Sequence, residues 1–367
     1  IAPFMTGVEP GGSVFGAAAN NSPGTGFDNL VVFGVDNPHL GTAAATGKPL
    51  GYCNGSSPIR NDHPADPIPS QFHIWSWEWD MANEPSNTLS NTGLDVIFDG
   101  QVNSAPTMEI RESSFANGAP AAEEFKIGSY EAVEVWDGPI GEIAVYSRHL
   151  TALESQNVNS YFSLKWGTTL DDDPAGSTTN YDYVDSDGTT IWGGTTDAAY
   201  QGYHNGIAGI GQDDASGLLQ KQAKSVRAGT SVAIYNGDQS GGLPTANTAN
   251  ASSFTADKTF MVWGHDGNLP DYATAYIPNT FVPASSYYHM ARIWKVAEAG
   301  MVGTVTIHGP FGAEHLLVHN AADFSVGTPT EIALTDDGNG NLVATVDLAD
   351  GDFFTFGRER YAPGGVV

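Results

Sequence analysis

Short runs of apolar and β-branched residues recur along the whole chain, and Gly, Asn, Asp, Pro or Ser bounds each run. Residues two apart share one face of a strand, so alternating runs of this length predict β-strands. We expect strands over 30–35, 71–80, 94–100, 140–147, 230–237, 259–264, 291–296, 303–309, 315–319, 342–348 and 352–357. Many short strands joined by turns predict an all-β chain built from sandwiches.

One segment, HLTALESQNVNSYFSLKWGTTL, has a different period. Thr151 and Glu154 have the spacing of a capping box, which marks the start of a helix. Val158 and Phe162 lie four residues apart on one apolar stripe, and a glycine follows where a helix would end. The pattern predicts one short helix over about 151–165.

The acidic segment TTLDDDPAGSTT follows the predicted helix. Its Pro and Gly, placed between two strand-rich regions, are typical of a linker. We therefore expect a first β domain over 1–167, a linker over 168–179 and a second β-rich domain over 180–360. The tail 361–367 has the composition of a linker to a further module.

The strand 71–80 raises the question of catalysis, because Glu78 and Asp80 lie two residues apart on one face. In an E-x-D-x-x-E glucanase strand, the third carboxylate would stand at position 83. That position is Asn83 here, and Glu84 comes one residue late, with the other parity. We interpret 71–80 as a strand with a tryptophan core face and a solvated acidic face. We expect no enzyme, with a glycan-active enzyme as the third alternative.

Three segments follow one another in an order that resembles the LamG-type, concanavalin A-like jelly roll. They are His73–Asp80, Leu94–Gly100 and Gly141–Glu154, and the last combines a strand, a turn and a helix start. The resemblance implies a jelly-roll sandwich for the first domain. It also implies that the family's N-terminal strands, which precede the segment resembling IAPFMTGVEPGGSVFG, are missing. An incomplete domain would leave a strand edge that needs a partner.

From residue 180 onward, the chain resembles an uncharacterised β-rich module that follows LamG domains in large bacterial surface proteins. YDYVDSDGTTIW, TFMVWGHDG and ARIWKVAEAGMVGTVTI carry this resemblance. It implies a companion domain without known chemistry.

The charge balance narrows the set of partners. The chain has 42 Asp and Glu against 14 Lys and Arg, a formal net charge of −28. Such a surface repels phosphate backbones and anionic membranes, so we expect neither as a partner. It suits hard cations bound through carboxylate oxygens. The single cysteine, Cys53, excludes an intrachain disulfide and a cysteine metal cluster.

Two loops carry oxygen side chains in a glycine-containing turn, which suits Ca²⁺. The candidate ligands are Asp182, Asp185 and Asp187 in YDYVDSDG, and Asp336, Asp337 and Asn339 in TDDGNGN. Neither loop completes an EF-hand, so an ordinary Asp/Asn/Gly hairpin turn is the alternative. The jelly-roll resemblance adds Glu142, because carboxylates on the matching strand of relatives contribute to a structural calcium.

Three aromatic residues, Trp192, Tyr200 and Tyr203, lie in loop-like sequence rich in Gly, Thr and Asn. Exposed rings of this kind stack on sugars, which makes them candidate ligand-binding residues. The alternative is that they cover a domain interface.

The resemblance and the composition together lead us to expect a non-catalytic module of a secreted, modular bacterial surface protein. Its role would be adhesion or glycan binding, with calcium as a structural ion, outside the cell or on its surface. The alternative is a self-assembling subunit of an extracellular fibre or sheath, in which copies of the chain complete one another by strand donation.

Overall fold

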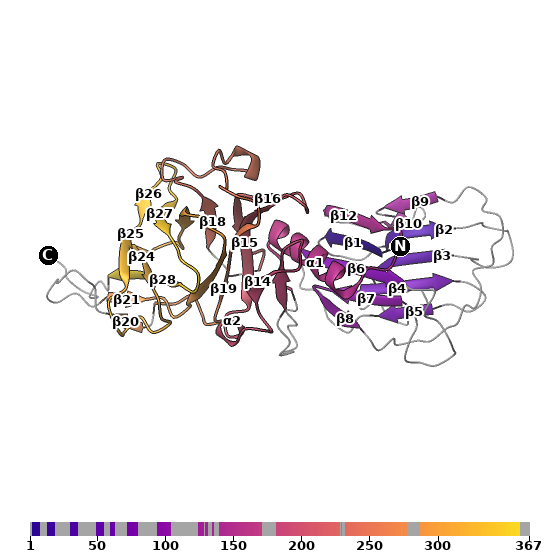
Figure 1. The fold of residues 1–367 in the computed structure, drawn as a ribbon, viewed down its shortest axis with the longest axis horizontal. Helices are drawn as coiled ribbons and strands as arrows, with labels where there is room; N and C mark the ends of the chain where they lie inside the picture. Colours follow the sequence, from indigo (N-terminus) through magenta and orange to yellow (C-terminus); the bar gives the residue numbers. More distant parts are fainter. Residues whose placement is uncertain are drawn as a thin grey trace. The chain divides into compact units, whose positions relative to one another are not determined.

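The computed structural model confirms an all-β chain, with several antiparallel sheets and two α-helices among the described residues. It describes residues 2–7, 13–18, 30–35, 49–54, 59–62, 72–79, 94–103, 124–127, 129–130, 134–135, 139–170, 181–227, 229, 232–272, 274–276 and 287–359. The chain divides into two compact units (Figure 1). Unit 1 comprises 1–159 and 171–178, and unit 2 comprises 160–170 and 179–367. The predicted linker lies largely outside the described residues, and the predicted domain boundaries stay predictions.

Unit 1 contains two five-stranded antiparallel sheets, ordered β12-β1-β6-β7-β8 and β5-β4-β3-β2-β9. The strands are β1 (Ala2–Gly7), β2 (Ser13–Ala18), β3 (Leu30–Val35), β4 (Pro49–Asn54), β5 (Ile59–Asp62), β6 (His73–Trp79), β7 (Leu94–Phe98), β8 (Gln101–Asn103), β9 (Glu124–Ile127), β10 (Ser129–Tyr130), β11 (Glu134–Val135) and β12 (Ile140–Tyr146). β10 and β11 form a separate small pair. β4 and β5 of one sheet contact β7 of the other.

β1 lies in the interior of its sheet. Phe4 is opposite Ser76 of β6 on one side and Ala144 of β12 on the other. The first strand of the chain is therefore not the open edge that the jelly-roll resemblance implied. Strand donation stays a prediction, and β1 does not support it.

The tryptophan strand β6 is buried on both faces over 74–77. Trp75 and Trp77 are 1% and 0% exposed, and their rings meet edge to face at 6.0 Å. Ser76, on the opposite face, is also fully buried, so the expected solvated face is absent at this position. The Glu78 side chain and Asp80 lie outside the described residues.

A buried histidine–aspartate pair fixes the turn between β7 and β8. Asp99 and Gly100 both have positive φ (47° and 92°), as a two-residue type I′ hairpin turn requires. His73 Nδ1 lies 2.6 Å from one Asp99 carboxylate oxygen, and the Ile74 amide donates to the other at 2.7 Å. These bonds tie the hairpin turn to the start of β6.

The predicted helix is confirmed as α1 (Ala152–Trp166), one residue from the expected bounds. The Glu154 amide donates to Thr151 Oγ1, and the Thr151 amide donates to Glu154 Oε2, which together make the predicted capping box. Both guanidinium nitrogens of Arg148 donate to Glu154, and this bidentate bond lowers the pKa of Glu154 to about 2. No helix among the described residues is long and apolar enough to cross a membrane.

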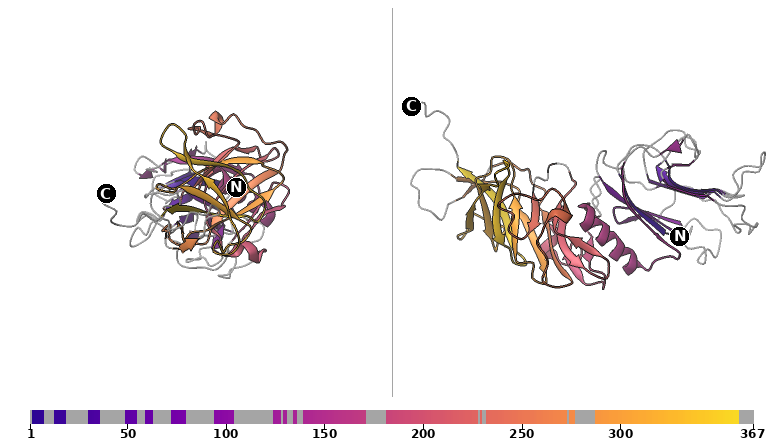
Figure 2. Two further views of the ribbon diagram at one scale, coloured as in Figure 1. Left: turned by 90° about the vertical axis from the view of Figure 1, so that its left-hand side faces the viewer. Right: turned by 90° about the horizontal axis from the view of Figure 1, so that it is seen from above.

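Unit 2 contains a nine-stranded and a five-stranded antiparallel sheet (Figure 2). The larger sheet runs β16-β15-β19-β22-β28-β21-β20, with β24 and β25 joined to β28, and the smaller runs β17-β18-β23-β27-β26. A separate hairpin, β13–β14, is followed by the one-turn helix α2. The elements are β13 (Asp182–Val184), β14 (Thr190–Gly193), α2 (Ala198–Gln201), β15 (Asn205–Asp213), β16 (Leu218–Gln220), β17 (Gln222–Lys224), β18 (Ala233–Asn236), η3 (Asn247–Ala249), β19 (Thr259–His265), β20 (Thr274–Tyr276), β21 (Tyr287–His289), β22 (Trp294–Ala299), β23 (Thr304–His308), β24 (His315–His319), β25 (Thr330–Ala333), β26 (Thr335–Asp336), β27 (Leu342–Asp347) and β28 (Phe353–Glu359).

One apolar core lies between the two sheets of unit 2. The nine-stranded sheet contributes Trp263 and Phe354, and the five-stranded sheet contributes Ile234 and Ile307. The rings of Trp294 and Phe354 stack at 5.5 Å within this core. Burial of large apolar side chains from both sheets is the main stabilising term of such a sandwich.

The C-terminal half of α1 packs on the outer face of the nine-stranded sheet. A side chain at Gly209 of β15 would place its Cβ 2.6 Å from Leu164 Cδ2 and 3.1 Å from Val262 Cγ2, so glycine makes room for the helix. Phe162 and Leu164 are buried. The Val184 amide donates to Ser160 Oγ at 3.0 Å, which ties β13 to the helix. The helix and the hairpin therefore form a third layer of unit 2.

Candidate functional site

The first acidic loop closes the β13–β14 hairpin. Asp185 Oδ1 accepts hydrogen bonds from the amides of Asp187 and Thr189, both at 2.9 Å. Gly188 takes the left-handed conformation at the tip, with φ 83°. These are the bonds of an Asx-type turn, in which the carboxylate substitutes for a backbone acceptor.

Asp182 lies at the base of the same hairpin. Its Oδ1 accepts from the amides of Thr195 at 2.6 Å and Thr196 at 3.1 Å. Burial alone would raise the pKa of Asp182, but these hydrogen bonds stabilise the carboxylate and lower the pKa overall. Asp182 therefore anchors the start of the α2 segment.

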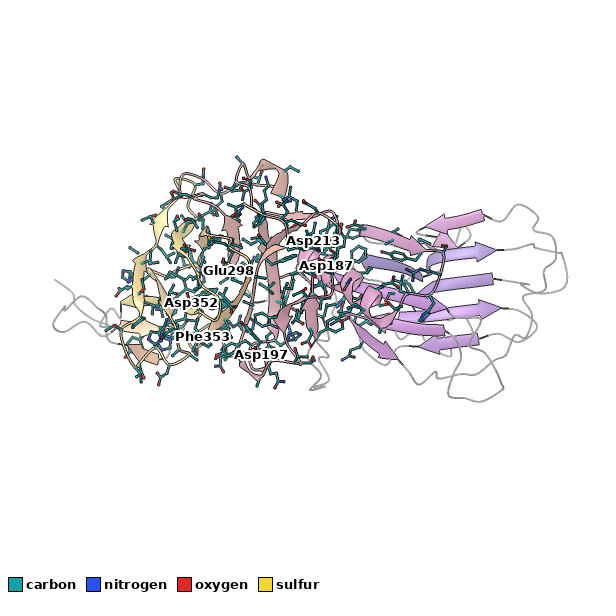
Figure 3. The ribbon with its side chains drawn as sticks, in the orientation of Figure 1. Asp187, Asp197, Asp213, Glu298, Asp352 and Phe353 are labelled. Carbon is teal, nitrogen blue, oxygen red and sulfur yellow. The ribbon has the colours of Figure 1, made fainter. Side chains whose placement is uncertain are left out.

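Lys258 contacts both Asp187 and Asp213, two carboxylates that are labelled in Figure 3. Lys258 Nζ lies 2.9 Å from Asp213 Oδ1 and 3.6 Å from Asp187 Oδ2, and it also donates to Ser186 Oγ. Burial opposes the charge on Lys258, but the hydrogen bond and charge of Asp213 raise its pKa overall. The ammonium thus places a positive charge beside Asp187, which is one of the candidate metal ligands.

Asp213 is almost completely buried, with a side chain 2% exposed. It accepts hydrogen bonds from the amide and the hydroxyl of Ser186 and from the amide of Ser216. Burial raises the pKa of Asp213, but the hydrogen bonds from Lys258 and Ser186 lower it overall. The side chain of Lys258 reaches it from a strained backbone, since φ of this residue is +56°.

The second acidic loop is a turn between β26 and β27. Asp337 Oδ1 accepts from the amides of Asn339 and Asn341, and its Oδ2 accepts from the Leu243 amide and Asn341 Nδ2. The side-chain bond from Asn341 is the largest cause of its lowered pKa. Asp336 Oδ1 accepts two further amides of the turn. Asn339 contributes its backbone to the turn.

The candidate metal ligands do not converge. Glu142 lies on the edge strand β12 of unit 1, while the two acidic loops belong to different hairpins of unit 2. Among the residues that the structure describes, no three Asp, Glu, His or Cys side chains form a group able to hold a metal ion. Calcium therefore stays a prediction.

The expectation that Trp192 is an exposed ring is wrong. Trp192 is 1% exposed, and its indole Nε1 donates to His204 Nδ1 at 3.0 Å. Tyr200 packs against it with ring centroids 4.8 Å apart. Tyr200 and Tyr203 are both half-buried, so only these two of the three predicted aromatic residues reach the surface.

A buried lysine that the sequence did not single out joins these tyrosines to β28. Lys295 is 5% exposed, and its Nζ lies 4.0 Å from the centroid of Phe353 and 5.0 Å from that of Tyr200. Such contacts are favourable cation–π interactions, strengthened by desolvation. Burial lowers the pKa of Lys295. Tyr203 meets Phe353 edge to face at 5.4 Å, which completes the cluster.

Carboxylates surround this aromatic–lysine cluster, defined by Tyr200, Tyr203, Lys295 and Phe353. Tyr200 Oη donates to Asp350 Oδ1 at 3.0 Å, and burial, followed by the charge of Asp350, raises the pKa of Tyr200. The charges of Asp197 and Asp352 also act on Lys295, and both residues are labelled in Figure 3. The cluster presents two half-buried tyrosines and several acidic oxygens at one surface.

The alternation of strand β22 indicates the position of Lys295 in the sheet. Lys295 lies between Trp294 and Val296, which both face the inter-sheet core. Alternation therefore places Lys295 on the outer face of the sheet, where a lysine normally meets solvent. The β13–β14 hairpin and α2 cover that face. No local pattern in the sequence predicts that these distant segments pack there.

Comparisons with known proteins return one family. A model described as Domain of unknown function (DUF8202) matches residues 154–352, a range that begins inside α1 and ends one residue before β28. No curated protein and no solved structure matches the chain.

Proposed function

The chain belongs to the DUF8202 family, a domain of unknown function, and from that premise we propose that it is a non-catalytic module of a secreted, modular bacterial surface protein. Its role would be adhesion or glycan binding, outside the cell or on its surface. A formal net charge of −28 keeps such a module soluble and disfavours nucleic acid or an anionic membrane as its partner.

One observation carries the proposal: the charged groups of the candidate site are bound to the chain itself. Asp182, Asp185 and Asp337 each accept two or more backbone amides. Lys258 is bound to Asp213, and Lys295 is enclosed by aromatic rings. An acid/base catalyst needs a titratable group that faces its substrate. Charged groups that are held by the fold in this way support a structural and binding role.

The aromatic–lysine cluster is the surface that we propose for ligand binding. Tyr200 and Tyr203 offer ring surface, and the neighbouring Asp197 and Asp352 offer acceptor oxygens for hydroxyl groups. Carboxylates at this surface repel uronic acids and sulfated sugars. The ligand class is therefore a neutral or amino-bearing glycan.

Binding to immobilised polysaccharides tests this surface. The native chain should bind a neutral or amino-bearing polysaccharide and ignore heparin, and Tyr203→Ala should weaken that binding at least about tenfold, or about 1.4 kcal/mol. Phe311→Ala is the matched control, because that ring is fully exposed elsewhere in unit 2 and its removal should change nothing. Equal losses in both variants, or preferential binding of heparin, would contradict the assignment.

We propose calcium as a structural ion of this module. The support is the excess of carboxylates and the second oxygens of Asp185 and Asp336, because among the described residues the turn amides bond to Oδ1 of each. A cation that binds only the folded state raises the melting temperature by mass action. Calorimetry at fixed ionic strength, with millimolar Ca²⁺ against EDTA, should show the higher temperature with Ca²⁺. Identical curves would remove calcium from the proposal.

A further inference from the structure

His204 is a buried histidine that links three segments of unit 2. It is 6% exposed and lies three residues after the end of α2. Its Nδ1 accepts from Trp192 Nε1 on β14 at 3.0 Å. Its Nε2 lies 2.9 Å from the carbonyl oxygen of Leu170, just after α1, and 3.3 Å from the Tyr181 amide nitrogen.

These contacts fix the tautomer of the imidazole. An indole N–H is a donor only, so Nδ1 of His204 must be unprotonated to accept from Trp192. A neutral imidazole then carries its proton on Nε2, where it donates to Leu170 O. Because Nε2 is a donor in this state, the longer contact from the Tyr181 amide is not a hydrogen bond.

A second proton has no place in this arrangement. It would sit on Nδ1 and face the Trp192 N–H, so two donors would oppose each other 3.0 Å apart. A Cβ placed on Gly194 would lie 2.6 Å from Nδ1 and 2.8 Å from Cε1, so the backbone encloses the ring closely. The two donors would face each other in a buried environment, so we expect the charged ring to be accommodated when the segments separate.

We propose that His204 is an acid-sensitive link that holds the β13–β14 hairpin and α2 on unit 2 and releases them when the imidazole is protonated. The hairpin and α2, residues 181–204, would then open while the two sheets remain folded. This inference concerns regulation of the surface that carries Tyr200 and Tyr203, but the acid opening does not depend on what that surface binds.

The groups around the ring shift the pKa of His204 in both directions. The pKa of His204 is lowered to about 4, and burial is the largest cause. The Leu170 carbonyl and the charge of Asp182 on β13 raise the pKa, and the charge of Arg227 lowers it. The other rings in contact, Tyr183 on β13 and Trp192 on β14, are neutral at these pH values. The neutral state is therefore favoured wherever the pH stays well above 4.

The sign of the effect follows from the lowered pKa. In the opened state the imidazole titrates near its ordinary value of about 6.5, so the opened state binds more protons between about pH 6.5 and pH 4. Stability of the closed arrangement is complete above about pH 6.5 and is lost as the pH falls through that window. The opening constant should rise about tenfold per pH unit.

Hydrogen exchange measured by mass spectrometry on the full chain tests the proposal. Between about pH 6.5 and pH 5, above most carboxylate titrations, residues 181–204 should lose protection about tenfold per unit after correction for intrinsic exchange. β27 should keep its protection. His204→Gln should abolish the slope, because glutamine does not titrate, and His149→Gln, on an exposed surface histidine, should preserve it. A slope that survives in His204→Gln, or parallel opening of β27, would overturn the proposal.

A second variant decides the matter if His204→Gln does not fold. Trp192→Phe removes the opposing N–H and leaves Nδ1 free to take a proton. The protonation midpoint of His204, followed by NMR of labelled histidine, should then rise by at least about one pH unit, a tenfold change in proton affinity. An unchanged midpoint, or a native His204 that titrates at its ordinary value, would show that the indole does not hold the ring neutral.

Discussion

Replacing Lys258 with methionine tests whether the chain supplies its own cation to the acidic cluster. The change keeps the length of the side chain and removes the ammonium that lies 2.9 Å from Asp213. The gross attraction at this separation is about 6 kcal/mol with an effective dielectric constant of about 20. Most of that is offset by the cost of taking both groups out of water.

The net loss can be bounded from the surroundings of the pair. Removing one partner of a fully buried pair costs about 3–5 kcal/mol. Here the Lys258 side chain is 23% exposed, and Asp213 keeps its bonds from Ser186 and Ser216. We therefore expect a loss of about 2 kcal/mol in the free energy of unfolding. For a domain of this size, that lowers the melting temperature by roughly 4–8 °C.

Urea unfolding at neutral pH and low salt measures the loss, and Lys224→Met is the matched control. Lys224 is exposed on β17, so its replacement should change stability by less than about 0.5 kcal/mol. A double-mutant cycle with Asp213→Asn should give a coupling of at least about 1 kcal/mol. The reasoning fails if Lys258→Met is as stable as Lys224→Met, or if the coupling is zero.

Two further predictions concern the outer layer of unit 2. Leu164→Ala should lower the free energy of unfolding by about 3 kcal/mol, because it leaves a cavity against the sheet. Leu153→Ala, at a half-exposed position of the same helix, should lower it by under about 1 kcal/mol. Equal losses in urea unfolding would contradict the packing of Leu164. Gly209→Ala should cost about 1–3 kcal/mol because its Cβ would overlap Leu164. Gly202→Ala, which meets nothing within 4 Å, should be neutral by the same measurement, and a silent Gly209→Ala would show that the helix does not approach closely.

Much of the secondary structure could be predicted because it depends on local patterns. Apolar alternation gave β19 and β27 to within one residue, and the capping box gave the start of α1. Alternation indicates which residues of a strand share a face, and this does not depend on which strands lie beside it. The β-rich fold follows from the number of such runs.

The arrangement of the site depends on contacts between distant segments, which the sequence pattern does not contain. Lys258 lies 45 positions from Asp213, and its role depends on a positive φ that lysine rarely adopts. Trp192 looked exposed because its neighbours are small and polar, yet His204 and Tyr200 cover it. The cover comes from a third layer, and only the folded chain shows which face that layer occupies.

The third layer also determines where this domain can be cut from its chain. α1 begins in unit 1 and ends in unit 2, and the family match likewise starts within the helix, at residue 154. Phe162 and Leu164 are as much a part of the second domain's interior as any of its strands. A chimeric protein that includes this domain must therefore also include α1, starting at the capping residue Thr151. A graft that starts at 180, where the composition suggests a boundary, would expose the outer face of the sheet and leave Val262 uncovered.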